Sequence, residues 1–544
     1  MRRSSESVSS SFTKEIAAVP GLGPDLSPSG PHERRAHSLR TLLPAARWSA
    51  GDIRFDGVAD SADQASPGDL VIHRVGDTDP IRVMAAAMAR GAAGILTEQW
   101  LPTPLPQCLV TDLDHAEAAV WSELLDHPDR RMLTIGVVGS AGKSTTALLI
   151  ANLFRSLGVR TAYQTDLGCS DGVVPSTPGE PLAFARDLVR WFGDAADCGS
   201  EVAIVELGER QLRHGTHDAI GCDLLVITGT ADPKADFGPT AIQCATERVI
   251  PGGAVIAPAD DAKTLRLVKD SGCTVVTYGT RRAAEVTVKL IEQEDGLTTS
   301  FLSHGDTTVV MESALCGGAM AANHAAAATV GVLLGQPLER IAESLGGLRS
   351  VPGRMQSVSE FGSAKTWIDA AGTPARAAET LRAARQMRRT GRLWCVLALS
   401  GNESPETLAR YGAITERFAD RVVLTAASQA QPQFLRLSHA VLDGVRECAA
   451  IRLVANHQRA VRWAVSQAGP NDSVVLLGAV RDHGGVRDHG DETLGDRRHQ
   501  RDRVAEIDRW IRDERERRQG QVSPPASTEK AADGKASPPF RVVG

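Results

Sequence analysis

One short stretch constrains the fold of this chain more than any other. Residues 133–138 form an apolar run, residues 139–146 contain two glycines followed by Lys-Ser-Thr-Thr, and residues 147–157 are again largely apolar. This order predicts a buried strand, a glycine loop and a helix. In such a unit the backbone N–H groups of the loop and the N-terminus of the helix cradle phosphate oxygens. The stretch therefore predicts a nucleotide-binding site in an α/β sheet.

The glycine loop follows the shorter of two known phosphate-loop patterns. Val137 stands where the eight-residue pattern has its first glycine, so only Gly-x-x-Gly-Lys-Ser remains. We expect the lysine to reach the outer phosphates and the serine hydroxyl to bind Mg²⁺. A glycine-rich turn without a ligand is the alternative. The residues expected to bind the nucleotide are Gly139, Ser140, Ala141, Gly142, Lys143, Ser144 and Thr145.

Composition narrows the class of protein. A chain of 544 residues is too long for one hydrophobic core, so about three domains are expected. The net charge of −6 shows no basic excess, which argues against a dedicated nucleic-acid binder. The nine cysteines include no C-x-x-C pair, so neither a disulfide framework nor a zinc site is indicated. Without a secretion signal or a continuous apolar run of about 18 residues, we expect a cytoplasmic protein.

The sequence divides into five segments. Residues 1–40 and 516–544 are rich in Ser and Pro and are expected to be disordered tails. Residues 41–131 predict a small α/β domain. Residues 132–351 alternate apolar strands with helices, which predicts a parallel sheet covered on both faces. Residues 352–515 repeat the alternation and predict a second, Rossmann-like α/β unit.

Two further features could bind a metal ion. Glu206 ends a strand that follows the phosphate loop, where a carboxylate can join Ser144 around Mg²⁺; a surface carboxylate is the alternative. Residues 481–491 contain Arg-Asp-His-Gly twice, and their His and Asp side chains could also bind a metal. We favour a solvated loop there, because nothing fixes the ligand geometry.

Taken in order, these pieces resemble the Mur ligases, and within them the UDP-N-acetylmuramoyl-tripeptide synthetases. The resemblance covers roughly residues 45–515 and depends on the order of short motifs more than on any one of them. Besides the glycine loop and Glu206, the motifs are Asp60-Ser61 with residues 67–70, Ser176-Thr177-Pro178, Ala259-Asp260-Asp261, Asn323, and residues 351–355, 368–374, 459–460 and 472–478.

The resemblance implies a fold, a reaction and further site residues. The fold would have three domains, with a phosphate-loop ATPase sheet at the centre. The reaction would be ATP-driven amide formation between a UDP-N-acetylmuramoyl-peptide and an amino acid, with Mg²⁺ and an acyl phosphate, by a monomer that binds no nucleic acid. Lys143 and Glu206 would be catalytic. Asn323, Arg354 and Asp369 would bind the nucleotide, and Ser61, Ser176 and Thr177 would bind the UDP-linked substrate.

Several positions depart from the family pattern. Thr246 stands where the family has a lysine that becomes carbamylated and supports a second Mg²⁺, and Gly372 replaces a histidine. In residues 228–236 a metal-holding histidine is missing, although Asp232 remains. The arginine that grips the carboxylate of the incoming amino acid is absent from residues 427–431. The missing residues are therefore those expected to support a second metal ion and those expected to bind the incoming amino acid.

Three functions therefore stay open. The first is the amide ligase, with a drifted amino-acid pocket. The second is a catalytically degenerate Mur-like protein that binds ATP in a regulatory or scaffolding role. The third is a folate or other glutamate ligase, which fits less well because such enzymes are not expected to carry the Asp60-Ser61 domain.

Overall fold

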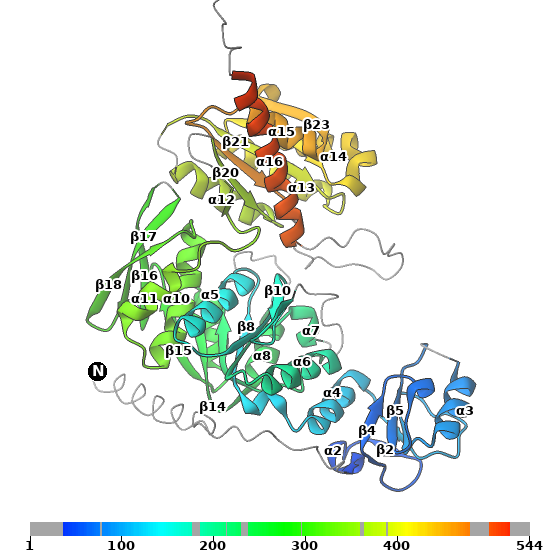
Figure 1. The fold of residues 1–544 in the computed structure, drawn as a ribbon. Helices are drawn as coiled ribbons and strands as arrows, with labels where there is room; N and C mark the ends of the chain where they lie inside the picture. Colours follow the sequence, from blue (N-terminus) through cyan, green and yellow to red (C-terminus); the bar gives the residue numbers. More distant parts are fainter. Residues whose placement is uncertain are drawn as a thin grey trace, which may run out of the picture.

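The computed structural model describes most of the chain between residues 36 and 522. Figure 1 shows α/β units that follow one another along the chain, each with its own sheet. This agrees with the predicted α/β fold. Within the described ranges, no helix is long and apolar enough to cross a membrane. These ranges are 36–76, 79–176, 185–213, 215–229, 238–294, 296–358, 364–387, 390–478 and 500–522.

Regular structure extends into both segments that were predicted to be tails. Strand β1 (His37–Ser38) and the fully buried Leu39 precede residue 41. At the other end, helix α16 (Gln500–Val522) continues past residue 516. The predicted tails were therefore too long on their inner sides, because composition does not reveal the burial of one leucine or the last turns of a charged helix. Residues 1–35 and 523–544 lie outside the described part.

The first unit is built on a five-stranded sheet with the order β2-β7-β6-β5-β4. Gly68 turns the chain into a buried strand: its φ is 91°, and a Cβ there would lie 2.7 Å from Asp56 Oδ1. The elements after β1 are α2 (Leu39–Leu42), β2 (Arg47–Trp48), β3 (Arg54–Phe55), β4 (Gly57–Ala59), η1 (Ala62–Gln64), β5 (Asp69–His73), α3 (Pro80–Arg90), β6 (Gly94–Thr97), β7 (Gln107–Leu109), α4 (Leu113–Leu124) and η2 (Pro128–Arg131).

The middle unit contains an 11-stranded sheet with the order β11-β10-β9-β12-β8-β13-β14-β15-β16-β17-β18. Neighbouring strands from β9 to β16 in this order are parallel, and all six residues of β8 are buried, as expected for a sheet covered on both faces. The strands are β8 (Leu133–Val138), β9 (Thr161–Thr165), β10 (Gly168–Ser170), β11 (Pro175–Ser176), β12 (Val202–Glu206), β13 (Cys222–Ile227), β14 (Val249–Pro258), β15 (Thr274–Gly279), β16 (Val286–Glu294), β17 (Leu297–His304) and β18 (Thr307–Ser313).

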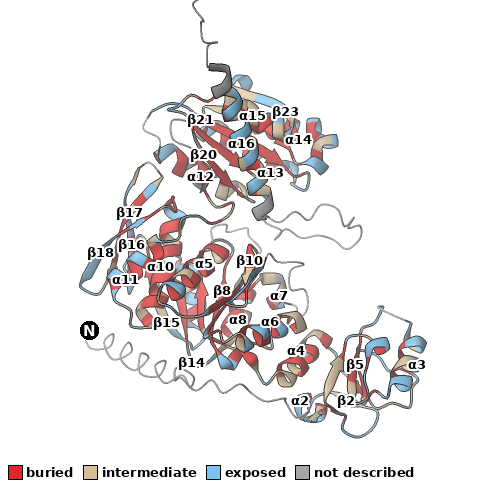
Figure 2. Ribbon diagram, viewed as in Figure 1, coloured by how far each residue is buried: buried red, intermediate tan, exposed pale blue. Residues whose placement is uncertain are grey.

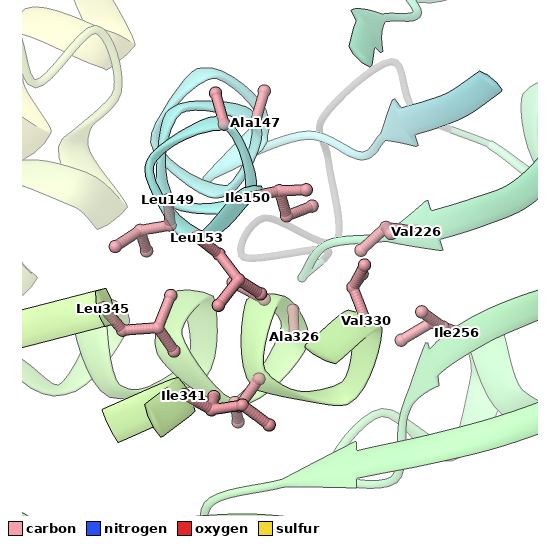
Figure 3. Close-up of a cluster of buried hydrophobic side chains, with 14 of the residues drawn as sticks. Ala147, Leu149, Ile150, Leu153, Val226, Ile256, Ala326, Val330, Ile341 and Leu345 are labelled. Atoms are coloured by element: carbon pink, nitrogen blue, oxygen red, sulfur yellow. The ribbon is translucent and has the colours of Figure 1, made fainter. Parts of the chain in front are cut away.

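Helices pack on both faces of this sheet. On one face, Leu153, Ala326 and Ile341 meet in a common apolar cluster, which Figure 3 shows in close-up. The packing there is tight, since a Cβ on Gly331 would lie 2.8 Å from Ile341 Cγ1. A second cluster, including Phe192, covers the other face. The helices are α5 (Lys143–Ser156), α6 (Ala185–Asp197), α7 (Glu209–Arg213), α8 (Pro239–Thr246), α9 (Ala262–Lys269), α10 (Gly318–Leu333) and α11 (Leu338–Gly346).

The antiparallel strands β16, β17 and β18 were not expected from the sequence. They extend one edge of the middle sheet, where Figure 2 shows exposed residues on the outer strand β18. One side of β17 is buried at Thr298, Ser300 and Leu302, while Phe301 on the other side is exposed. Polar residues thus occupy two of the buried positions of β17, so this strand lacks the apolar alternation from which a strand is predicted.

The third unit has a six-stranded sheet with the order β19-β20-β24-β21-β22-β23, parallel except for β19. Ile507, Trp510 and Ile511 of α16 join the apolar cluster on one of its faces, so this charged helix also belongs to the core. The elements are β19 (Gln356–Ser357), β20 (Lys365–Asp369), α12 (Pro374–Met387), β21 (Leu393–Leu399), α13 (Pro405–Phe418), β22 (Arg421–Ala426), η3 (Ser428–Gln433), α14 (Phe434–Leu442), η4 (Cys448–Ala450), β23 (Ile451–Asn456), α15 (His457–Gln467), β24 (Ser473–Leu477) and α16.

Candidate nucleotide site

The glycine loop lies between the end of β8 and the start of α5. Gly139 has a φ of 146°, and a Cβ there would lie 2.3 Å from the Thr228 hydroxyl oxygen and 2.9 Å from the Thr228 carbonyl oxygen. Gly142 has a φ of 85°, and a Cβ there would lie 2.3 Å from Asn323 Oδ1. Both positions therefore require glycine for backbone conformation and for space.

The loop is tied to the end of the neighbouring strand β13. The Thr228 hydroxyl lies 2.6 Å from the carbonyl oxygen of Ala141, and the Ser140 hydroxyl donates to the carbonyl of Gly229 at 3.0 Å. Hydrogen bonds of this kind fix the loop before any ligand arrives. No local pattern in the sequence indicates this role of Thr228, because the role depends on the parallel pairing of β8 and β13.

Glu206 brings together the loop residues that were expected to bind phosphate and metal. Because β12 pairs with β8 in parallel, Glu206 lies opposite Val137, two residues before the first glycine of the loop. Its Oε2 accepts a hydrogen bond from the Ser144 hydroxyl at 2.7 Å, and its Oε1 lies 3.5 Å from Lys143 Nζ. Only 4% of the Glu206 side chain is exposed, against 20% for Lys143.

A carboxylate and a hydroxyl at one point are suitable ligands for Mg²⁺. This cation prefers a few protein oxygens together with water and phosphate oxygens, and Ser144 and Glu206 fit that preference. The adjacent ammonium group of Lys143 can neutralise phosphate charge. Within the described residues, no group of three or more His, Cys, Asp or Glu side chains is placed to hold a metal ion.

The remaining nucleotide-binding candidates of the middle unit lie around the same loop. Asn323 comes from α10, and its Nδ2 lies 3.7 Å from the sulfur of Met320 while its Oδ1 faces Gly142. Thr145 is buried in the first turn of α5. The structure thus brings Asn323 to the loop and turns Thr145 into the protein interior.

Arg354 and Asp369 lie at the junction between the middle and third units. The two carboxylate oxygens of Asp369 accept hydrogen bonds from the backbone N–H groups of Met355 and Ala371, both at 2.9 Å. Burial raises the pKa of Asp369 above its usual range, and the positive charge of Arg354 opposes that rise. Gly353 and Met355 both have positive φ angles, so Asp369 holds a sharply turned segment.

The third unit also reaches the glycine loop itself. Arg376, in the first turn of α12, places its Nη2 at 3.4 Å from the carbonyl oxygen of Ser140. Sequence reasoning missed this residue. The two partners are 236 positions apart in the chain, and an arginine at the start of a helix has no distinctive local pattern.

Ser61 lines a cavity in the first unit. It precedes η1, and the polar lining also includes Asp60, His73, Arg74 and Arg82. This cavity lies next to the contact between the first and middle units. There, the fully buried Glu117 of α4 pairs with Arg74 and, at 3.1 Å, with Arg186 of α6.

Other sequence predictions fall at the edge of the described ranges or beyond it. Ser176 ends β11, the last described strand before a gap, and pairs with Cys169. Thr177, Asp232 and the repeated Arg-Asp-His-Gly segment at 481–491 lie outside the described residues. The substrate role of Ser176 and Thr177 and the metal role of that segment therefore stay predictions.

The departures from the Mur pattern are visible around Thr246. Its hydroxyl donates to the Gln243 carbonyl at 2.9 Å, within its own helix α8. The next residue, Glu247, is exposed and accepts a hydrogen bond from Gln243 Nε2 at 3.3 Å. Thr246 carries no charge, and the carboxylate of Glu247 stands on a much shorter side chain than that of a carbamylated lysine.

Comparison with known proteins identifies the family of the chain. Residues 137–331 match the Mur ligase middle domain, and residues 353–480 match the Mur ligase glutamate ligase domain. Together these matches span the glycine loop, Glu206, Asn323, Arg354 and Asp369.

Two relatives match most of this chain and most of their own length. The UDP-N-acetylmuramoyl-L-alanyl-D-glutamate–2,6-diaminopimelate ligase of Synechococcus elongatus is 26% identical, over 81% of this chain and 93% of its own. The ligase of the same name from Gloeobacter violaceus is 27% identical, over 85% and 99%.

Solved structures share the fold. A 2,6-diaminopimelate ligase of the same name has a TM-score of 0.64 and 19% identity, covering 88% of this chain and 100% of its own. The MurF ligase of Thermotoga maritima in complex with ADP has a TM-score of 0.58 and 16% identity, covering 85% and 98%. With a glycine loop, a strand-end glutamate and matched middle and C-terminal domains in the family order, the chain belongs to the Mur ligase family.

Proposed function

We propose that this protein is an ATP-dependent amide ligase that adds an amino acid to a UDP-N-acetylmuramoyl-peptide. The observation that carries the proposal is the placement of Glu206 against both Ser144 and Lys143 at the glycine loop. A turn without a ligand has no need to hold a carboxylate, a hydroxyl and an ammonium group at one point. The relatives' names supply the class of acceptor.

The glycine loop would bind the phosphates of ATP. Backbone N–H groups of residues 139–144 would surround them, and Lys143 would neutralise the outer phosphate. Ser144 and Glu206 would hold Mg²⁺, which would offset the negative charge of the phosphates. Asn323 and Arg354 border the loop and the junction, where they would contact the rest of the nucleotide.

The reaction would proceed in two displacements. An oxygen of the precursor's carboxylate attacks the γ-phosphorus, the bond to the β-phosphate oxygen breaks, and ADP leaves. The amine of the amino acid then attacks the acyl carbon, phosphate leaves, and the nitrogen loses a proton to give the amide. Charge builds up on phosphate oxygens in the first step, where fixed cations lower the barrier most.

The cavity beside Ser61 is the proposed site for the UDP-linked substrate. The Ser61 hydroxyl and the cationic side chains of Arg74 and Arg82 line this cavity, which lies in a different unit from the ATP loop. A nucleotide-linked precursor could bind there and extend across the contact between the first and middle units. Ser176 and Thr177 are the proposed contacts on the middle unit.

One observation favours a second candidate, a Mur-like protein that binds ATP without ligation. The hydroxyl of Thr246 bonds within its own helix, and the carboxylate of Glu247 is exposed. Neither side chain offers the metal ligand that the family pattern places at this position. Such a protein would bind nucleotide, and its role would be regulatory or scaffolding.

Phosphate release separates the two candidates. The full chain would be incubated with Mg-ATP, UDP-N-acetylmuramoyl-dipeptide and a panel of amino acids that includes diaminopimelate and lysine, with Lys143→Ala as the control. Release that needs both the UDP-linked substrate and one amino acid supports the ligase and names its amino acid. ATP binding without release across the panel supports the second candidate.

A further inference from the structure

The third unit brings an arginine, Arg376, to the glycine loop, in addition to the positive charge of Lys143 in the loop itself. Arg376 is the third residue of α12, and its Nη2 lies 3.4 Å from the Ser140 carbonyl oxygen. Ser140 belongs to the segment whose backbone N–H groups would cradle phosphates. The Arg376 Nη2 that approaches this carbonyl therefore lies at the rim of the proposed phosphate site.

The positive charge of Arg376 acts on two carboxylates of the third unit. Burial raises the pKa of both Asp369 and Glu379, and the positive charge of Arg376 acts against the rise in each case. Asp369 is also the residue that holds the Met355 backbone at the junction. The Arg376 guanidinium thus lies within the electrostatic reach of the junction and against the loop.

The contact with Ser140 is long for a hydrogen bond between N–H and oxygen, which is usually about 2.7–3.2 Å. A phosphate oxygen is a stronger acceptor than a neutral carbonyl, and the planar guanidinium can hold two acceptors at once. Phosphate bound in the loop would therefore compete well for the Arg376 donors. Lys143 would act on the same phosphates from the first turn of α5.

We propose that Arg376 contacts the γ-phosphate of ATP and supplies a second cationic side chain, besides Lys143, to the phosphoryl group as it is transferred. The cation comes from the third unit, so the site is complete only when that unit is seated on the glycine loop. This role rests on the proposed function, in which the loop binds ATP. An arginine delivered to a transferring phosphoryl group from outside the phosphate loop can raise the rate by about 10³-fold or more.

The ratio of ATP to ADP affinity tests this role directly. Calorimetric titrations of the full chain with Mg-ATP and Mg-ADP would compare the natural protein with Arg376→Ala and Arg376→Lys. Loss of a charge-assisted hydrogen bond to the γ-phosphate should weaken ATP binding about tenfold or more, while the Kd for ADP changes by less than about twofold. The ATP affinity of Arg376→Lys should lie between those of the natural protein and Arg376→Ala, because lysine keeps the charge and loses the planar fork.

Arg382 provides a matched control on the same helix. Its guanidinium is exposed, lies 5.4 Å from the centre of the Phe418 ring, and also acts on the pKa of Glu379. Arg382→Ala should leave both affinities unchanged. Equal weakening of ATP and ADP by Arg376→Ala, or no weakening of either, would overturn the proposed role. If the natural protein binds neither nucleotide, the nucleotide site is refuted, and this inference with it.

Discussion

The contact between Gly142 and Asn323 gives a prediction whose size follows from the structure. An alanine at position 142 must keep a φ near 85°, which costs an L-residue about 1–2 kcal/mol. Its Cβ would also lie 2.3 Å from Asn323 Oδ1, so the carboxamide must rotate away, at a further cost of about 0.5–1.5 kcal/mol. We expect Gly142→Ala to lower the free energy of unfolding by about 1.5–3.5 kcal/mol.

The two contributions can be separated by a double-mutant cycle. In Gly142→Ala/Asn323→Ala the crowding disappears and the backbone cost remains. The double variant should therefore be about 1 kcal/mol more stable than the sum of the single effects predicts. For a domain of this size, that difference corresponds to roughly 2–4 °C in melting temperature, which thermal unfolding of the full chain can resolve.

Gly158 is the control for the backbone contribution. Its φ is 81°, and a Cβ there would meet nothing within 4 Å. Gly158→Ala should cost only the backbone contribution, and its effect should add to that of Asn323→Ala within about 0.5 kcal/mol. If the Gly142 cycle is equally additive, Asn323 does not press on the loop, and the packing argument for its place beside the nucleotide fails.

Three further predictions concern charge. Lys143→Ala should weaken Mg-ATP binding by about tenfold or more in calorimetry, whereas Lys263→Ala on the exposed side of α9 should not; unchanged binding in the first variant would contradict the loop assignment. Glu206→Gln should raise the Mg²⁺ concentration needed for half-maximal ATP binding about tenfold, and an unaltered requirement would remove Glu206 from the metal site. Burial lowers the pKa of His217 and His324 from 6.5 to about 4, and that of His457 to about 3. The unfolded chain therefore takes up these protons first, and the stability present above pH 6.5 is lost as the pH falls toward those values, by about 1.4 kcal/mol per pH unit for each histidine. His457→Gln should reduce the slope of the unfolding free energy against pH by one proton, and an unchanged slope in urea titrations would refute the buried neutral form.

The sequence predicts the central part of the fold because the relevant signals are local. The apolar run of β8, the two glycines and the Lys-Ser pair follow one another, so strand, loop and helix can be read without knowing any distant contact. Glu206 could be placed near the loop for a related reason. The carboxyl ends of neighbouring parallel strands meet at one edge of a sheet, and Glu206 ends such a strand.

The rest depends on contacts between distant segments. Thr228 supports the loop only because β13 lies beside β8, and Arg376 reaches Ser140 only because two units meet. Strand β17 escaped prediction because its buried positions include Thr298 and Ser300. In each case the side chain is ordinary, and its partner, far away in the chain, gives it its role.

The buried Glu117 has a consequence for exchanging parts between relatives. Its carboxylate lies between Arg74 of its own unit and Arg186 of the next, and Asp60 lies 3.5 Å from the same Arg186. Removing one partner of a buried ion pair leaves an uncompensated charge, at a cost of about 3–5 kcal/mol. A chimera that takes its first unit from a relative will therefore keep its junction only if Arg186 is exchanged together with Glu117. The boundary along which this protein can be recombined is set by these four charged side chains, and it does not coincide with the linker between the sheets.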